Sequence, residues 1–154
     1  MDIDRPPIED PSLRRLFDYW QGKRRGRFAP SRGDIDPAQL TFILPFLYLV
    51  DVVGSPPRFR YRLAGTGIVT EYGGEITGKF ADEIDLDEKQ AAIIAEYARV
   101  VRDGKPASSR WSYTKNDDRH LTYEHLILPL SSDRRSVDML LGGAMVRGVG
   151  GAGA

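Results

Sequence analysis

The sequence has no cysteine among its 154 residues. Disulfide bonds, thiolate metal sites and cysteine nucleophiles are therefore all excluded. A chain without cysteine also suits a reducing compartment, and we expect a cytoplasmic protein.

Histidine is almost as scarce, with only His120 and His125. These residues are five positions apart, and on an extended strand an odd spacing directs side chains to opposite faces. They therefore cannot converge on one metal ion, or act together as a base and the group that orients it. No nucleophile motif and no pair of carboxylates stands out either. We predict no metal site, no catalytic residues and no enzymatic activity.

An excess of charge and a long apolar run are also missing. Lys plus Arg equals Asp plus Glu at 22 each, so no overall field attracts nucleic acid or an anionic membrane. The longest apolar stretch, residues 42–50, is interrupted by Pro45 and falls far short of the roughly 20 residues of a membrane helix. The polar N-terminus has no signal-peptide core. We therefore expect a soluble protein with no membrane insertion.

Basic residues nevertheless gather in two places, after a first predicted helix at residues 23–32 and along one strand at Arg58, Arg60 and Arg62. No helix-turn-helix pattern accompanies them, so we interpret both as solvated faces paired with acidic residues and expect no nucleic-acid partner. Gly65-Thr66-Gly67 resembles the start of a dinucleotide-binding loop, but Thr70 stands where the third glycine belongs. We interpret these glycines as residues of a tight turn.

Periodicity predicts a single domain over residues 11–147 with its core at about 44–147, after a flexible arm at 1–10 and before a disordered tail at 148–154. Asp10 is a good N-cap and Pro11 a good first residue for a helix over 11–24. A long helix is expected over 87–103, with Asp87 as its cap and Gln90 in a relative of the capping box. Short helices and turns are expected over 65–85. The predicted strands are 47–53, 58–63, 107–115, 120–130 and 137–146.

The predicted elements occur in the order of PAS domains: a helix, two strands, short helices, a long helix and three strands. The sequence resembles a bacterial family of short, single-domain PAS-like proteins. The likeness extends over residues 12–146 and is moderately specific because six pieces occur in the right order. These are Leu16-Phe17-Asp18-Tyr19-Trp20, Pro30-Ser31-Arg32-Gly33-Asp34-Ile35-Asp36-Pro37, Leu44-Pro45 through Asp51-Val52, Phe59-Arg60-Tyr61-Arg62-Leu63-Ala64-Gly65-Thr66, Ile76-Thr77-Gly78-Lys79 and Leu128-Pro129-Leu130-Ser131.

The resemblance implies an α+β fold, with a five-stranded antiparallel sheet, helices on one of its faces and an N-terminal amphipathic helix. It implies a pocket for a small molecule between the sheet and the long helix, and a sensory or regulatory role in signal transduction without catalysis. A flavin–cysteine adduct is excluded because there is no cysteine, and haem is disfavoured because residues 87–103 contain no histidine. Tyr97 is a poor axial ligand, and a neutral, hydrogen-bonded His125 is favoured over a ligating one. We expect no cofactor beyond an unidentified organic ligand.

Side chains with an apolar body and a polar tip suit such a ligand pocket. The candidates are Tyr61, Tyr72, Tyr97, Trp111, Tyr113, Tyr123 and His125. Strand 120–130 leaves its inward face open, because the set that includes Tyr123 and His125 and the set that includes Glu124 and Leu126 are both plausible. Two other functions also remain open: an adaptor with a filled core and no ligand, and a small cone-fold-like α+β enzyme.

The N-terminal helix carries an apolar stripe of four residues. They are Leu13, Leu16, Phe17 and Trp20. This stripe must pack on the chain's own sheet or on a partner, and we expect it to contact a second copy in a homodimer. The signal would then leave through an unidentified partner protein.

Overall fold

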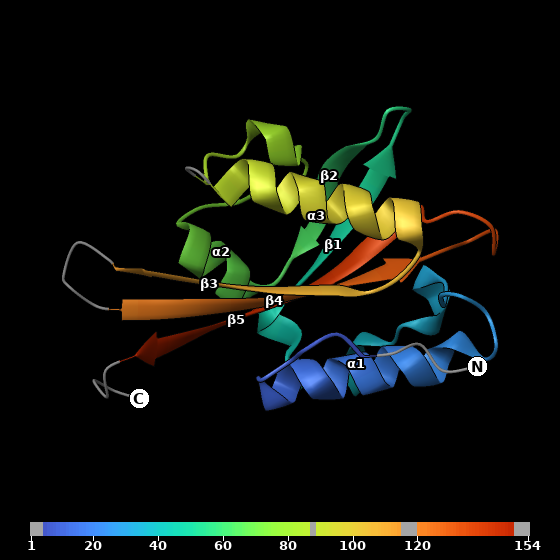
Figure 1. Cartoon of the computed structure of the whole chain (residues 1–154), viewed down its shortest axis with the longest axis horizontal. Helices are drawn as coiled ribbons and strands as arrows, with labels where there is room; N and C mark the ends of the chain where they lie inside the picture. Colours follow the sequence, from blue (N-terminus) through green and yellow to red (C-terminus); the bar gives the residue numbers. More distant parts are fainter. Residues whose placement is uncertain (1–4, 87–88, 115–119, 150–154) are drawn as a thin grey trace.

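The computed structural model describes residues 5–86, 89–114 and 120–149. Its five strands form one antiparallel sheet in the order β2-β1-β5-β4-β3 (Figure 1). The strands are β1 (Leu47–Val53), β2 (Arg58–Ala64), β3 (Ala107–Thr114), β4 (His120–Leu130) and β5 (Met139–Val149). The helices are α1 (Pro11–Arg24), α2 (Thr66–Tyr72) and α3 (Lys89–Asp103), with short 3-10 turns η1 (Arg32–Asp34), η2 (Pro37–Gln39), η3 (Leu44–Phe46) and η4 (Ala81–Glu83). The predicted fold class is confirmed.

Helices cover both faces of this sheet. Figure 1 shows α1 on one side, and α2 and α3 on the other. Alternate residues of β1 separate accordingly, with Leu47 and Leu49 in the core beneath α1 and Tyr48 and Val50 in the core beneath α3. Strand β4 behaves in the same way, so both of its candidate inward sets face a packed layer. The unbroken burial of residues 126–131 follows from this arrangement.

The apolar stripe of α1 packs within its own chain. Leu13, Leu16 and Trp20 are 0% exposed and Phe17 is 3% exposed. The Trp20 indole N–H also donates to the Pro129 carbonyl of β4 over 2.8 Å. Of the two arrangements that the sequence left open, the structure has the intramolecular one. These four side chains leave almost no surface for a partner, so they do not fit the predicted dimer contact.

The segment before α1 is attached to the sheet and is not a loose arm. The backbone N–H groups of Glu9 and Asp10 donate to the two carboxylate oxygens of Glu124 over 2.7 and 2.8 Å. Ile8 is buried, and the Ser108 hydroxyl donates to the Pro7 carbonyl over 2.7 Å. The predicted flexibility is therefore wrong for residues 7–10, and residues 1–4 lie outside the described residues.

The expected bounds of β5 change in the structure, β2 ends one residue later than expected, and two other expectations fall on residues outside those described. The last strand runs from residue 139 to 149, so Gly148 and Val149 belong to β5 and not to the tail, whose remainder lies outside the described residues. Strand β3 is described as far as Thr114. Asp87 lies outside the described residues. The Gln90 side chain donates to the carbonyls of Ala81 and Ile84, so it ties η4 and its following residue to α3.

The glycines at the start of α2 serve close packing and not turning. Gly65 has an ordinary φ of −67°, but a Cβ there would lie 2.4 Å from the Pro45 carbonyl oxygen. A Cβ on Gly67 would lie 2.5 Å from the Phe46 ring. These absent side chains let η3 approach α2 closely.

Candidate functional site

A cavity of about 350 Å³ lies between the sheet and the α2–α3 layer. Its walls come from η3, β1 to β5, α2, α3 and the segment between α2 and α3. The lining residues are Phe46, Tyr48, Tyr61, Gly67, Ile68, Glu71, Tyr72, Ile76, Ile84, Asp85, Leu86, Lys89, Ile93, Trp111, Tyr123, His125, Ala144 and Val146. Aromatic and aliphatic side chains predominate, with a small number of polar groups among them. This composition is typical of pockets for small organic molecules.

Five of the seven predicted ligand residues line this one cavity. They are Tyr61, Tyr72, Trp111, Tyr123 and His125. Tyr97 lies behind the wall, 1% exposed, and its hydroxyl forms a 2.8 Å hydrogen bond with that of Tyr61. Tyr113 belongs to β3, but its side chain lies outside the described residues.

Three tyrosines form a cluster on one side of the cavity, where Tyr48 and Tyr61 line it and Tyr97 lies behind them. The Tyr48 ring lies 5.9 Å from Tyr61 and 6.5 Å from Tyr97, measured between ring centroids. Burial raises the pKa of Tyr61 to about 12, and it raises the pKa values of Tyr48 and Tyr97 well above their ordinary range. All three side chains are therefore neutral phenols that can donate and accept hydrogen bonds.

His125 belongs to β4 and lines the cavity. Its ring and that of Trp111 are perpendicular, with ring centroids 4.6 Å apart, and the centroid of the Tyr48 ring lies 6.3 Å from it. Burial, with a smaller effect of the Lys89 charge, lowers the pKa of His125 to about 4. The imidazole is thus neutral at physiological pH. Its Nδ1 atom is buried and has no hydrogen-bond partner within the described part of the chain.

Charged residues collect around the cavity next to Tyr123. The Tyr123 hydroxyl donates to Glu71 of α2, and the Lys89 ammonium lies 5.4 Å from the centre of the Tyr123 ring. Asp85 is exposed on the segment before α3. The hydrogen bond between Tyr123 and Glu71 connects α2 to β4 across the cavity.

Sequence reasoning missed Tyr48, Glu71 and Lys89. Tyr48 could have been found from its alternation with Leu47 and Leu49, because a polar-tipped aromatic on a strand buried on both faces points to a site. Glu71 and Lys89 are ordinary helix residues. Only the packing of α2 and α3 over the sheet brings them to the cavity.

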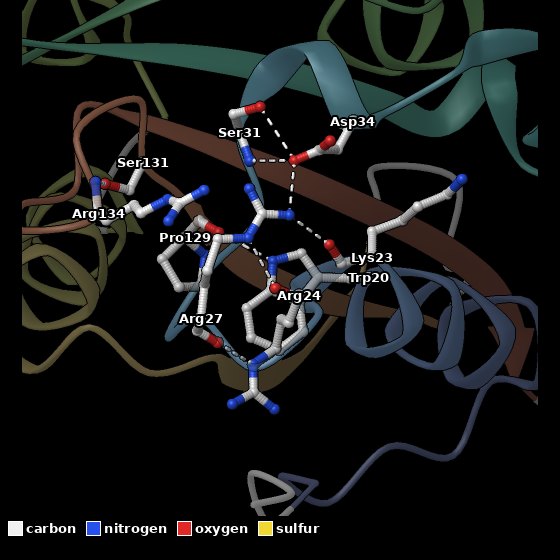
Figure 2. Close-up of polar contacts among 9 residues, drawn as sticks. All are labelled: Trp20, Lys23, Arg24, Arg27, Ser31, Asp34, Pro129, Ser131 and Arg134. Atoms are coloured by element: carbon white, nitrogen blue, oxygen red, sulfur yellow. Dashed lines mark hydrogen bonds and ion pairs between the residues drawn. The ribbon is translucent and has the colours of Figure 1, made fainter.

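The basic cluster at the end of α1 forms a structural clamp (Figure 2). Arg27 donates to the last carbonyls of the helix, those of Lys23 and Arg24, and pairs with Asp34 of η1 at 2.9 Å. Hydrogen bonds from Ser31, with a smaller contribution from Arg27, lower the pKa of Asp34 to about 2. The second basic group also pairs with acids, Arg58 with Asp82, and Arg60 and Arg62 with Asp51. The predicted pairing with acidic residues is thus present for Arg58, Arg60 and Arg62, and in the first cluster for Arg27. Arg24 of that cluster is buried and does not belong to a solvated face.

Metal binding and membrane insertion find no support in the described structure. Within residues 5–86, 89–114 and 120–149, no three or more His, Asp or Glu side chains are grouped so that they could hold a metal ion. No helix in those ranges has the length and apolar character needed to span a membrane.

A protein-family model of the PAS domain matches residues 8–145. The chain belongs to the PAS domain family. Solved structures agree at the level of the fold. A LOV protein of Rhodobacter sphaeroides matches this PAS domain with a TM-score of 0.50 and 19% identity, over 77% of this chain and 71% of its own. The PAS domain of BvgS from Bordetella pertussis matches with a TM-score of 0.51 and 20% identity, over 70% of this chain and 85% of its own.

A light-oxygen-voltage domain studied with a flavin analogue has a TM-score of 0.52 and 15% identity, over 74% of this chain and 84% of its own. At such identities the likeness concerns the fold alone. Among proteins of curated function, none matches this PAS domain significantly.

Proposed function

We propose that this PAS domain is a non-catalytic sensory or regulatory module that binds a small organic molecule between its sheet and the α2–α3 layer. The observation that carries the proposal is the cavity of about 350 Å³ with its mainly aromatic and aliphatic lining. A recess lined by aromatic and aliphatic side chains with a few polar groups is typical of ligand sites and is not needed by a domain whose only task is to present its outer surface.

The output of the proposed module is a contact with another protein, either a second copy or a different chain. The apolar stripe of α1 is buried in its own chain and does not supply this surface. The contact would therefore use another face of the domain. Homodimerisation remains part of the proposal, and the experiment below measures it directly.

A cone-fold-like enzyme is the less favoured function. Asp85, His125 and Tyr123 do line one cavity, which is the combination that such an enzyme would use. A histidine that acts as a base, however, is normally oriented by a hydrogen bond to its second ring nitrogen. Nδ1 of His125 has no such partner among the described residues.

Native mass spectrometry of the purified protein tests the binding function. We expect an additional non-covalent mass on the native protein that is absent after denaturation. Ala144→Leu is the matched variant, because Ala144 lines the cavity and a larger side chain there reduces its volume. This variant should lose the additional mass while keeping the oligomeric state of the wild type. A bare polypeptide mass, together with no hit in a thermal-shift screen of small molecules, would instead support the adaptor.

A further inference from the structure

Two polar atoms of residues that line the cavity have no hydrogen-bond partner within the described part of the chain. They are Nδ1 of His125 and the hydroxyl oxygen of Tyr48, and both atoms are buried. Their residues line the same cavity, and their rings lie 6.3 Å apart. Burial raises the pKa of Tyr48, and the nearby Tyr97 side chain lowers it in part. The two hydroxyls nevertheless do not form a hydrogen bond of normal geometry. Buried polar groups in native proteins are almost always paired, so an unpaired couple at one cavity indicates a missing partner.

The chemistry of the two groups restricts what this partner is. A neutral imidazole uses Nδ1 either as a donor or as an acceptor, and a phenol hydroxyl can do both. A hydroxyl group is the smallest partner that satisfies both groups whichever tautomer His125 adopts. A carboxylate can only accept, and an ammonium group can only donate.

The charges around the cavity also favour a neutral ligand. His125 and Tyr48 carry no charge that could neutralise an ion in the cavity. The cavity is lined by charges of both signs, Glu71 and Asp85 together with Lys89, so they do not select an ion of one sign. Burial of an uncompensated charge is strongly unfavourable, whereas a neutral polar group requires only its hydrogen bonds.

The remaining wall is suited to a flat ring. Trp111 and Tyr123 stand on β3 and β4 beside His125, and Tyr61 and Tyr72 complete an aromatic lining. Aromatic rings pack on one another in offset or edge-to-face arrangements, which a planar ligand can join.

We infer that the ligand of this PAS domain is a neutral, hydroxylated aromatic compound whose hydroxyl group pairs with His125 and Tyr48. The inference rests on the proposed function, since it concerns the same cavity. It makes His125 and Tyr48 the residues that select for the hydroxyl, and the aromatic wall the part that selects for the ring.

The experiment compares three probes that share one ring system and differ only in the polar group: 2-naphthol, naphthalene and 2-naphthoate. Binding to the full chain is followed by the fluorescence of Trp111 in a Trp20→Phe background, and by calorimetry with the unaltered protein. We expect 2-naphthol to bind about tenfold more tightly than naphthalene, as one good hydrogen bond would provide, and 2-naphthoate to bind most weakly.

Tyr48→Phe removes only the hydroxyl, and His125→Phe removes both ring nitrogens while keeping a ring. Each variant should reduce the affinity for 2-naphthol about tenfold and leave that for naphthalene unchanged. Tyr19→Phe is the control, because it removes a hydroxyl that pairs with Gln39 outside the cavity. It should change neither affinity. Two independent variants keep the test valid if one of them fails to fold.

The inference is overturned if naphthalene binds as tightly as 2-naphthol, if 2-naphthoate binds best, or if neither cavity variant weakens 2-naphthol. Equal binding of naphthalene and 2-naphthol would mean that bound water already satisfies the two polar atoms. The proposed function would stand in each of these cases. Failure of all three probes, with a bare mass in native mass spectrometry, would overturn the proposed function and the inference together.

Discussion

His125 should make the stability of this domain depend on pH between its ordinary pKa of 6.5 and its lowered pKa of about 4. In the unfolded chain the imidazole takes up a proton as the pH falls below 6.5, whereas in the folded chain burial delays this until about pH 4. The unfolded state therefore binds more protons within this window. The contribution of His125 to stability is fully present above pH 6.5 and is lost as the pH falls towards 4.

The size of the effect follows from the gap between the two pKa values. It corresponds to roughly 3 kcal/mol of unfolding free energy lost by pH 4, at about 1.4 kcal/mol for each factor of ten in proton affinity. For a small domain this is a large part of the total stability. The groups around the ring, Tyr48, Glu71, Asp85, Lys89 and Tyr123, are the ones that could modify it.

The assay is urea denaturation at a series of pH values for the wild type and for His125→Phe. Subtraction of the two curves removes the contribution of groups common to both, such as Glu96, whose pKa is raised mainly by burial. We expect the variant to lose about 3 kcal/mol less than the wild type between pH 6.5 and 4. Parallel curves for the wild type and His125→Phe would refute the reasoning.

Three further predictions concern the framework that holds the cavity, each measured as a change in the free energy of unfolding. Glu124→Gln should cost about 2 kcal/mol, because the amide offers an N–H group to a backbone donor. Glu9→Gln removes only an exposed ion pair with Arg110 and should cost much less. Equal costs would contradict the role of Glu124. Gly65→Ala should cost about 1–3 kcal/mol, because its Cβ would collide with the Pro45 backbone. Gly22→Ala has open space around it and should be neutral or stabilising by up to about 1 kcal/mol. A similar destabilisation by both variants would count against the packing argument. Trp20→Phe should cost about 2–3 kcal/mol through its lost hydrogen bond and volume, and an unchanged stability would mean that α1 is not anchored at that point.

Local patterns in the sequence determined the elements of this fold. Asp10 and Pro11 placed the start of α1, and the bounds predicted for that helix, for β1 and for β4 are those of the structure. Such signals depend on neighbours within about four positions, because a helix repeats every 3.6 residues and a strand every two. The element order and the resemblance to PAS domains follow from the same local information. Five of the seven candidate ligand residues lie at one cavity for a related reason, since polar-tipped aromatics are suited to pockets.

Tertiary structure alone decided what each face contacts. Strand β4 shows two plausible inward faces because both are covered, one by α1 and one by α3, and no local pattern distinguishes two buried faces. Glu124 pairs with backbone 114 and 115 residues earlier, and Tyr123 pairs with Glu71 from another element. The cavity is likewise assembled from segments far apart in the chain. Its volume and its two unpaired polar atoms are properties of how these segments pack, which the sequence of any one segment does not contain.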